Sequence, residues 1–355
     1  MATGAPLGLN FSYQSKDPWK NSTTCESSQL WEVLHEALPP ILIVIFFFGL
    51  VGNIFVLAVF LLHRNRLTVA EIYLANLAAA DLIFVISLPV WAKNIKNEFN
   101  WPFGESVCRG INGLIKANLF TSIFLVVAIS MDRYWALVHT ITCRKKRSRR
   151  RAQTICAVIW FAGGLLSIPT MVFRTVKYFP ELNISACILD FPSPSWNNYK
   201  IILLSVVGFV LPLLAIVFFN YQILTSLWGR EDPKLKRSGE TKDVKATTLI
   251  LTLVVIFLLC WAPYHFFSFF DFLFGKKVLK GCFWEDFIDL GIQLSTFLSF
   301  INSCLNPIIY VFVGKFFRAK VWEIYKQRFQ RKSALTYVSS EKKPTGFTLD
   351  TKTTF

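Results

Sequence analysis

Seven long apolar stretches, separated by short polar segments, dominate the sequence. Each has about 20 residues or more, the length that an α-helix needs to cross the hydrocarbon core of a bilayer. The stretches are Leu38–Leu62, Ile72–Ala92, Gly110–Met131, Ala152–Phe173, Ile201–Trp228, Ala246–Phe270 and Leu290–Gly314. The second contains Asp81 and the third contains Lys116, whereas the others contain no Asp, Glu, Lys or Arg. The pattern predicts an all-α membrane protein built as a seven-transmembrane helix bundle.

The segments between the spans are too short to hold a separate soluble core. We expect an extracellular glycosylated tail over 1–37, a membrane domain over 38–314, an amphipathic helix over 315–326 and a disordered cytoplasmic tail over 327–355. The short helix is predicted because apolar residues after the seventh span fall on one helical face, which would lie along the inner membrane surface. The last segment is rich in Ser, Thr and Lys, a composition typical of disorder.

The net charge is +16, and the positions of the basic residues indicate which partners they contact. Basic residues crowd at 63–66, 144–151 and 234–245 and again after Gly314, and with seven spans these segments share one side of the membrane. The positive-inside rule makes that side cytoplasmic and places the N-terminus outside the plasma membrane. We therefore expect contacts with membrane lipids and docking of a protein partner, not binding of nucleic acid.

Eight cysteines divide between the two sides of the membrane, and four of them meet an oxidising environment outside. Four cysteines allow three pairings. We expect Cys108 to bond Cys187 and Cys25 to bond Cys282. We expect no structural metal site, because no His accompanies these cysteines at zinc-ligand spacing. Three N-glycosylation sequons also fall outside under this topology. They begin at Asn10, Asn21 and Asn183.

Asp81 lies in the middle of the second span, where a lone carboxylate must be protonated, paired or bound to a cation. Neutral oxygen atoms on the third and seventh spans could join it around a small hard cation. Sodium is the expected occupant, because magnesium demands octahedral geometry and retains water. A protonated Asp81 in a hydrogen-bond network is an equally weighted alternative to this allosteric sodium ion. The other residues of the site are Asn118, Ser122, Asn302, Ser303 and Asn306.

The third span ends in Asp132-Arg133-Tyr134. Arg133 needs an acceptor when the bundle is closed, and Asp243, at the start of the sixth span, is the candidate. We predict a latch of Asp132, Arg133 and Asp243 that breaks when the sixth helix moves outward. The alternative is a pair of interfacial charges that reach water.

Prolines lie within or near the ends of five spans, and each removes a backbone hydrogen bond and clashes with the preceding turn. We expect kinks there, which create hinges and pockets. Trp261 lies just below the proline of the sixth span, where its alternative role is core packing. Tyr310 follows the proline of the seventh span and carries a hydroxyl close to the cytoplasm. The five prolines are Pro89, Pro169, Pro212, Pro263 and Pro307.

The outer half of the bundle combines a cationic wall with an anionic wall. Lys116 lies about two turns into the third span, where an ammonium is costly unless it faces a wet cavity and an anion. Lys200 begins the fifth span, and Asp271 and Asp289 lie opposite. Aromatic residues line or flank this space, namely Trp91, Trp101, Tyr264, Phe267 and Phe300. The arrangement suits an extended peptide with a basic N-terminus and a C-terminal carboxylate. Ordinary interfacial charge is the alternative, and it explains Glu285 and Asp286 better than Lys116.

In order along the chain, these motifs resemble the rhodopsin-like G-protein-coupled receptors, over roughly Pro39 to Gln327. The resemblance rests on one motif or pair for each span, including Asp132-Arg-Tyr, Cys260-Trp-Ala-Pro263 and Asn306-Pro-Ile-Ile-Tyr310. It implies that a ligand shifts the bundle towards a state open on the inside, which admits a G protein. The implied activation switches are Asp132, Arg133, Tyr134, Asp243, Trp261, Pro263, Asn306, Pro307 and Tyr310.

Within that family the sequence is similar to the bradykinin receptors, through Asn100-Trp-Pro-Phe-Gly and Asn302-Ser-Cys-Leu-Asn-Pro. Lys116 indicates the subtype that prefers kinins lacking the C-terminal Arg, because it would attract a carboxylate and repel an arginine side chain. The resemblance implies a kinin peptide ligand, a heterotrimeric G protein of the Gq class with Gi as a second class, calcium signalling and arrestin recruitment. The implied ligand-binding residues are Lys116, Asn112, Lys200, Asp271, Asp289, Trp91, Tyr264, Phe267, Gln293 and Phe300.

One departure from the family concerns the inner-surface helix. No cysteine follows Gly314, so the lipid anchor common after this helix is not available. Receptors for another small peptide, angiotensin-like or chemokine-like, remain an alternative that changes only the ligand. A membrane transporter is the alternative of another class, but it predicts paired charges along a path and often internal repeats. We expect no enzyme, because no nucleophile–base pair or metal cluster is evident.

Overall fold

The computed structural model describes residues 29–63, 66–138, 148–193, 195–228, 240–315 and 317–327. Within these ranges the side chains of 29–35, 197, 227–228 and 240–246 are not described. The predictions that concern Asn10, Asn21, Cys25, the Asp243 side chain and the tail beyond residue 327 therefore lie outside the described residues.

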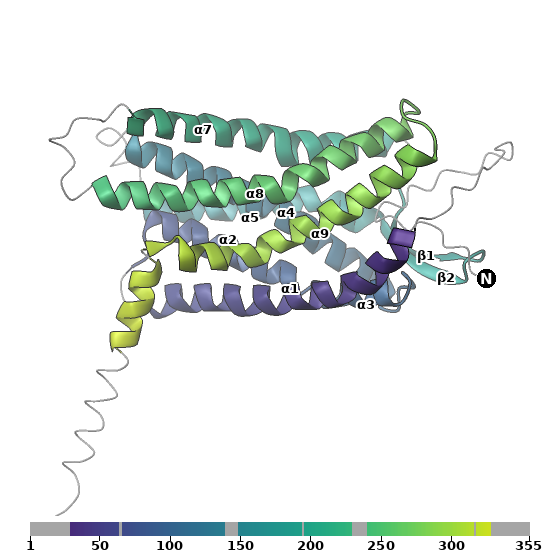
Figure 1. The fold of residues 1–355 in the computed structure, drawn as a ribbon, viewed down its shortest axis with the longest axis horizontal. Coiled ribbons are helices and arrows are strands. Elements are labelled where there is room, and N and C mark those ends of the chain that lie inside the picture. Colours follow the sequence, from purple (N-terminus) through teal and green to yellow (C-terminus); the bar gives the residue numbers. More distant parts are fainter. Residues whose placement is uncertain are drawn as a thin grey trace, which may run out of the picture.

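Seven segments of the described chain are long and apolar enough to cross a membrane, as the sequence predicts. The spans are Glu36–Leu62, Val69–Lys96, Gly104–Leu137, Arg149–Phe173, Asn198–Ser226, Thr247–Gly275 and Cys282–Phe312. They form one elongated bundle (Figure 1). Its helices are α1 (Gln29–Leu62), α2 (Val69–Val85), α3 (Leu88–Lys96), α4 (Gly104–Leu137), α5 (Arg149–Phe173), α6 (Ser195–Ile201), α7 (Leu211–Trp228), α8 (Glu240–Gly275) and α9 (Cys282–Phe312).

Two spans are interrupted next to prolines, as expected from the missing backbone donor. The second span breaks into α2 and α3 at Ile86 and Ser87, and Pro89 occupies the first turn of α3. The fifth span contains a π-helical segment, η1 (Ile202–Val210), immediately before Pro212. A π-helical turn moves backbone bonds to partners five residues away. Here the Leu211 N–H bonds to the Val206 carbonyl.

A β-hairpin covers one end of the bundle, which we call the hairpin end (Figure 1). Its strands, β1 (Arg174–Phe179) and β2 (Ile184–Leu189), pair antiparallel. Our sequence analysis did not predict it, although the alternation around buried Ala186 and Ile188 is typical of a half-buried strand. The predicted Cys108–Cys187 disulfide is present and joins α4 to β2. Cys282 is also disulfide-bonded, and its predicted partner Cys25 lies outside the described residues.

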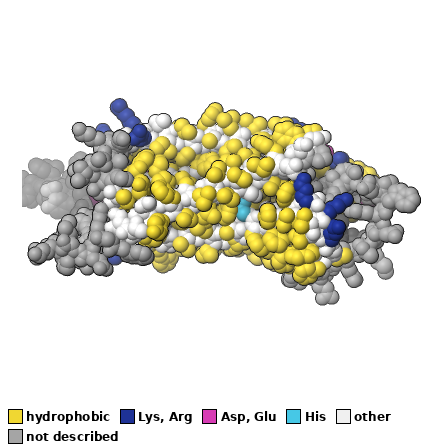
Figure 2. Space-filling view, turned by 90° about the horizontal axis from the view of Figure 1, so that it is seen from above, with side chains coloured by type: hydrophobic (Ala, Val, Ile, Leu, Met, Phe, Trp, Pro, Cys, Tyr) yellow, Lys and Arg dark blue, Asp and Glu magenta, His cyan; other side chains and the backbone are white. Residues whose placement is uncertain are grey.

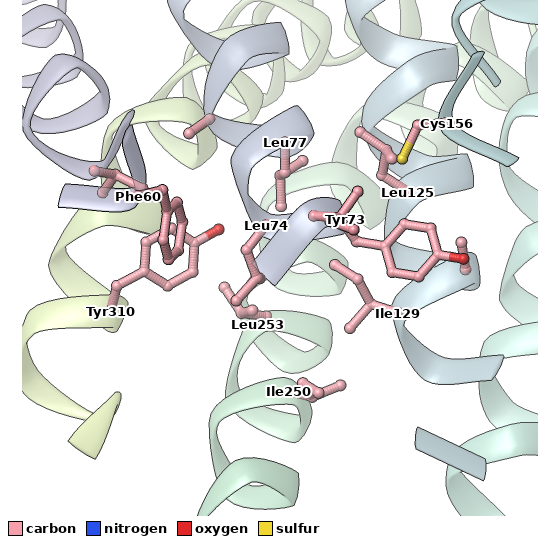
Figure 3. Packing of buried hydrophobic residues seen from close by; sticks show 14 of the residues in the cluster. Phe60, Tyr73, Leu74, Leu77, Leu125, Ile129, Cys156, Ile250, Leu253 and Tyr310 are labelled. Carbon is pink, nitrogen blue, oxygen red and sulfur yellow. The ribbon is translucent and has the colours of Figure 1, made fainter. Parts of the chain in front are cut away.

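Buried polar side chains tie the helices together inside the bundle. The Asn53 amide donates to the carbonyl oxygens of Gly49 and Ser303, at 2.9 Å each, and so joins α1 to α9. The Trp160 indole donates to the Asn76 side chain at 3.0 Å and joins α5 to α2. Around these bonds lies the main hydrophobic cluster, whose packing Figure 3 shows from close by. It gathers residues from α1, α2, α4, α5, α8 and α9, together with Phe317, near the end opposite the hairpin.

Residues 317–327 form the predicted short helix at that opposite end, shown in yellow beyond α9 in Figure 1. Its buried Phe317 packs against Phe55, Phe60 and Tyr310, with ring centroids 5.8 to 6.1 Å away. The Lys320 ammonium lies 2.8 Å from the Glu71 carboxylate at the start of α2. Contacts with the helical bundle therefore hold this helix, which has no cysteine to carry a lipid anchor.

Apolar side chains cover the flanks of the bundle between two ends that carry Lys and Arg (Figure 2). Phe48, Phe161 and Leu214 are each more than three-fifths exposed, on α1, α5 and α7. Side chains of this kind are stable when lipid surrounds them, because lipid tails are as apolar as the residues. The fold class predicted from the sequence, a seven-transmembrane helix bundle with a short amphipathic helix, is confirmed.

Candidate functional site

The first candidate site lies at the hairpin end and is built around Tyr264 of α8. The Lys116 ammonium, on α4, lies 5.8 Å from the centre of the Tyr264 ring, a cation–π distance. Lys200, on α6, lies close enough to Tyr264 and Asp271 to interact with both electrostatically. We call Lys116, Lys200, Tyr264 and Asp271 the hairpin-end site. The structure thus brings together four of the residues predicted to bind a ligand.

Arg174 adds a third cation that our sequence analysis missed. It is the first residue of β1, is buried, and interacts electrostatically with both Lys200 and Tyr264. Its guanidinium Nη1 donates to the Cys187 carbonyl at 3.0 Å. Burial lowers the pKa of Arg174 to about 10, so the group remains charged at neutral pH. The sequence signal was a lone arginine directly after the fourth span.

No carboxylate of the described residues forms an ion pair with Arg174, and its Nε has no hydrogen-bond partner among them. Among the described residues, three cations thus interact with Tyr264, and Asp271 is the acid that interacts with Lys200. A buried cation is costly unless an anion compensates it. Arg174, whose Nε has no acceptor among the described residues, could therefore bind a negative group brought by a ligand.

A second group of charges lies beside the first and is acidic. Asp289, on α9, interacts with Asp271, Glu285 and Asp286. Like charges destabilise one another, so this group favours a cationic partner. The structure thus supports a cationic wall and an anionic wall, which meet where Lys200 approaches Asp271.

Several buried polar atoms near the hairpin-end site lack a hydrogen-bond partner among the described residues. Native proteins satisfy such atoms with protein, water or ligand, so these atoms are available to bond a ligand that enters the site. His265 is among them: its ring stacks on Phe209 at 4.3 Å, and its Nδ1 is unsatisfied. The others, beside Arg174 Nε, are Ser205 Oγ, Trp261 Nε1 and Ser268 Oγ, of which Ser268 lies close to the Tyr264 side chain. Sequence analysis did not select His265, Ser205 or Ser268, because they resemble ordinary core residues.

The predicted aromatic and amide residues occupy varied positions. Trp91 and Phe300 belong to the hydrophobic cluster between α1, α2, α3 and α9, where Phe300 packs 5.1 Å from Phe84. Phe267 packs against Phe287 of α9, at 5.4 Å. The remaining residues are polar: Asn112 donates to the Cys187 sulfur at 3.4 Å, and Gln293 is buried. For all five of these residues, contact with a ligand stays a prediction.

The second candidate site surrounds Asp81, which is completely buried in the middle of the bundle. Its Oδ2 accepts a hydrogen bond from Asn306 at 2.8 Å, and its Oδ1 has no hydrogen-bond partner among the described residues. Asn118 and Ser303 lie beside the carboxylate, and Asn118 donates to Ser122 at 3.2 Å. The side-chain oxygen of Asn302, Oδ1, likewise has no hydrogen-bond partner among the described residues. These unsatisfied oxygens fit the predicted sodium ion, since hard cations prefer oxygen ligands.

The predicted switch residues Asp132, Arg133 and Tyr134 lie in the last turns of α4, away from the hairpin. Arg133 Nη2 lies 3.7 Å from Asp132 Oδ2, so the two neighbours do interact, although adjacent helical residues point in different directions. Tyr134 packs 5.4 Å from Phe219 of α7. The predicted contact with Asp243 lies outside the described side chains.

Trp261 and Tyr310 are both buried. The Trp261 ring stacks 6.0 Å from Phe257, one turn earlier on α8, and Pro263 lies within the same helix. Tyr310 lies in the cluster beside Phe60, and Figure 3 labels both rings. Its hydroxyl has no hydrogen-bond partner among the described residues. Its role as a switch stays a prediction.

The remaining predicted modification site, Asn183, lies at the exposed tip of the hairpin. Its backbone has a φ of 52°, a turn conformation that asparagine tolerates well. The Tyr178 hydroxyl donates to its side-chain oxygen at 2.8 Å. The position is accessible to a modifying enzyme on the hairpin side.

Comparison with known proteins agrees with these features. Residues 52–310 match the family described as 7 transmembrane receptor (rhodopsin family). The chain is 60% identical to the B1 bradykinin receptor of Chlorocebus aethiops over 328 residues, which cover 92% of this chain and 93% of the relative. It is also 60% identical to the human B1 bradykinin receptor over 323 residues, covering 91% and 92%. With the B1 bradykinin receptor of Sus scrofa it shares 54% identity over 345 residues, 97% of each chain. The chain therefore belongs to the rhodopsin family of seven-transmembrane receptors and, within it, to the bradykinin receptors.

Proposed function

We propose that this protein is a cell-surface receptor for kinin peptides that lack the C-terminal Arg. The observation that carries the proposal is the set of three cations around Tyr264, with Asp271 as the nearby acid. The relatives are named as B1 bradykinin receptors, and their similarity extends over almost the whole chain.

The charge arrangement gives a physical basis for selecting between kinins. A terminal carboxylate placed between Lys116, Lys200 and Arg174 would form charge-assisted hydrogen bonds, the strong class of hydrogen bond. An additional C-terminal arginine would bring a fourth cation into the same space. The acidic group around Asp289 would receive the basic N-terminal residue of the peptide.

Topology and signalling follow from the same proposal. The hairpin end faces the outside, and the 317–327 helix faces the cytoplasm, where a G protein of the Gq class binds and calcium rises; Gi is a second class. Arrestin binds the phosphorylated tail. Changing a population from 1:99 to 99:1 requires about 5.5 kcal/mol of differential affinity, so the peptide must bind the open state far better than the closed one.

The Asp81 site supports regulation by sodium as part of this function. A cation held by Asp81 and the neighbouring amide oxygens would stabilise the closed state, because it pairs the buried carboxylate between α2 and α9. Loss of the ion on activation would then favour the open state.

Substitution of Lys116 tests the ligand assignment. We expect Lys116→Ser to weaken des-Arg kinin binding by about tenfold or more, the effect of losing one charge-assisted bond. Binding of the full-length kinin should stay unchanged or improve. The matched control is Lys177→Ser, which removes an exposed lysine paired with Asp190 on the hairpin.

Radioligand binding with kinins of differing C-termini, on cells whose surface receptor is counted through an epitope tag, gives both affinities. Undiminished des-Arg kinin affinity, with no gain for the full-length peptide, would remove Lys116 from the ligand site. Calcium release after exposure to a panel of small peptides separates kinins from angiotensin-like and chemokine-like ligands. Tags at both chain ends, stained before and after permeabilisation, test the orientation.

A further inference from the structure

A groove opens on the lipid-facing flank of the bundle between α1 and α9. It has a volume of about 410 Å³. Its ten lining residues are all apolar, and the exposed ones include Phe48, Val51 and Phe312. Gly52 lets α1 approach α9 closely at the floor of the groove, because a Cβ there would lie 2.9 Å from the Pro307 ring.

The groove extends from mid-membrane to the end of the bundle that carries the 317–327 helix. On α9 it spans Cys304 to Phe312, the last turns of that helix, a length of about 12 Å at the helical rise. One leaflet of the hydrocarbon core is about 15 Å thick. The depth of the groove therefore matches most of an acyl chain in one leaflet, and not a ligand lying across the bilayer.

A cation lies at the mouth of the groove. The exposed Arg318 bonds through Nη1 to the carbonyl oxygens of Val311 and Phe312, two residues that line the groove. A guanidinium has five N–H donors. Those on Nε and Nη2 of Arg318 have no acceptor among the described residues, and Lys315, also exposed, lies three positions earlier. The mouth can thus bind an anionic group while the groove holds an apolar chain.

We propose that this groove is a binding site for an anionic phospholipid, with one acyl chain between α1 and α9 and the headgroup on Arg318. Basic groups where a helix leaves the membrane bind anionic headgroups, and each contributes about a fivefold preference near the surface. Ordinary surrounding lipid has no such preference, because apolar surface alone does not distinguish one headgroup from another. Under the topology proposed above, the lipid comes from the cytoplasmic leaflet; binding itself does not depend on that topology or on a kinin ligand.

Photochemical labelling of the full-length protein in phosphatidylcholine vesicles tests the site. The vesicles contain a trace of phosphatidylserine with a photoreactive acyl chain or, in parallel, phosphatidylcholine with the same chain. Mass spectrometry maps the labelled peptides. We expect the serine lipid to label 47–55 and 304–312 about fivefold more than the choline lipid does. Labelling of the exposed face of α5, around Phe161, is the internal reference and should show no preference.

Matched variants separate the headgroup contact from the groove. Arg318→Ala should abolish the preference, Arg318→Lys should keep most of it, and Lys326→Ala, on the same helix, should have no effect. Val51→Trp should fill the groove and lower labelling by both lipids, whereas Phe161→Trp on the opposite flank should not. Size-exclusion chromatography and thermal unfolding confirm that each variant is folded.

Three outcomes overturn the proposal. Equal labelling of the groove by the two lipids would mean that only ordinary surrounding lipid contacts it. If the Arg318→Ala variant were still labelled more strongly by the serine lipid than by the choline lipid, the headgroup would bind elsewhere. Cross-links between two receptor chains through 47–55 or 304–312, at the expense of lipid labelling, would identify the groove as an interface between copies of this protein.

Discussion

Two adjacent glycines on α5 provide a direct test of helix packing. A Cβ added to Gly163 would overlap the Thr121 hydroxyl and lie 3.2 Å from the Ala117 carbonyl oxygen of α4. A Cβ added to Gly164 would meet no atom within 4 Å. Small residues at helix contacts allow membrane helices to approach closely, and α4 packs extensively against α5. Alanine at the two positions should therefore have opposite effects.

The magnitudes follow from these surroundings. Thr121 is completely buried, so its hydroxyl has little space to move away from a methyl group at position 163. Overpacking of this kind costs about 1–3 kcal/mol. Gly164→Ala removes the entropic cost of a glycine inside a helix and should stabilise the protein by about 0.5–1 kcal/mol. The two variants should thus differ by roughly 1.5–4 kcal/mol in the free energy of unfolding.

Thermal unfolding in detergent can measure this difference without a known ligand. Cys156, Cys260 and Cys304 are free and buried, so a thiol-reactive fluorescent dye reports the temperature at which the bundle opens. One kcal/mol corresponds to roughly 2–4 °C in Tm for a domain of 150–250 residues. We expect Gly163→Ala to melt several degrees below the unsubstituted protein and Gly164→Ala to melt slightly above it.

Equal changes in Tm for Gly163→Ala and Gly164→Ala would refute the reasoning. They would show that α4 and α5 do not meet at Gly163 as the structure has it. A second control is Gly163→Ser with Thr121→Ala, in which the space vacated by the threonine side chain should recover much of the lost stability. No recovery would point to the Ala117 backbone as the obstacle.

Three further predictions concern charged groups. Arg174→Gln should weaken des-Arg kinin binding about tenfold more than full-length kinin binding; equal weakening in a radioligand assay would assign Arg174 to holding the hairpin alone. Asp81→Asn should remove the difference in agonist affinity between sodium and choline chloride, and a variant that keeps this difference would contradict the sodium site. Glu71→Gln and Lys320→Gln should show a coupling of about 1 kcal/mol or more in a double-mutant cycle of thermal stability, since both side chains are about one-seventh exposed. Gln at position 71 can still cap α2 through Thr68, so the cycle isolates the ion pair, and a coupling near zero would exclude it.

The sequence predicted the parts of the fold that depend on one helix at a time. The spans were found because about 20 apolar residues in a row have few alternatives. The break before Pro89 and the π-helical turn before Pro212 follow from a missing donor, although the sequence could not tell which distortion each proline produces. Topology and oxidising surroundings limited the four outer cysteines to three pairings, and the predicted Cys108–Cys187 bond is present.

The features that were missed depend on how segments meet in space. Arg174 looked like a charge at the end of a span, and only the hairpin places its guanidinium beside Tyr264 and Lys200. Phe300, which is predicted to contact the ligand, also packs in the cluster with Phe84 of α2, and the sequence did not indicate that neighbour. Its contact with a ligand stays a prediction. Periodicity identifies a buried face, but it does not identify the neighbour that covers that face.

The position of Phe317 shows how far along the sequence the packed helical bundle extends. Its ring fills the space between Phe55, Phe60 and Tyr310, so any rotation of Tyr310 must either carry this ring along or leave a void. The first turns beyond the seventh span are therefore packed into the bundle in this conformation. A shortened receptor intended to keep this packing should retain the chain through residue 327.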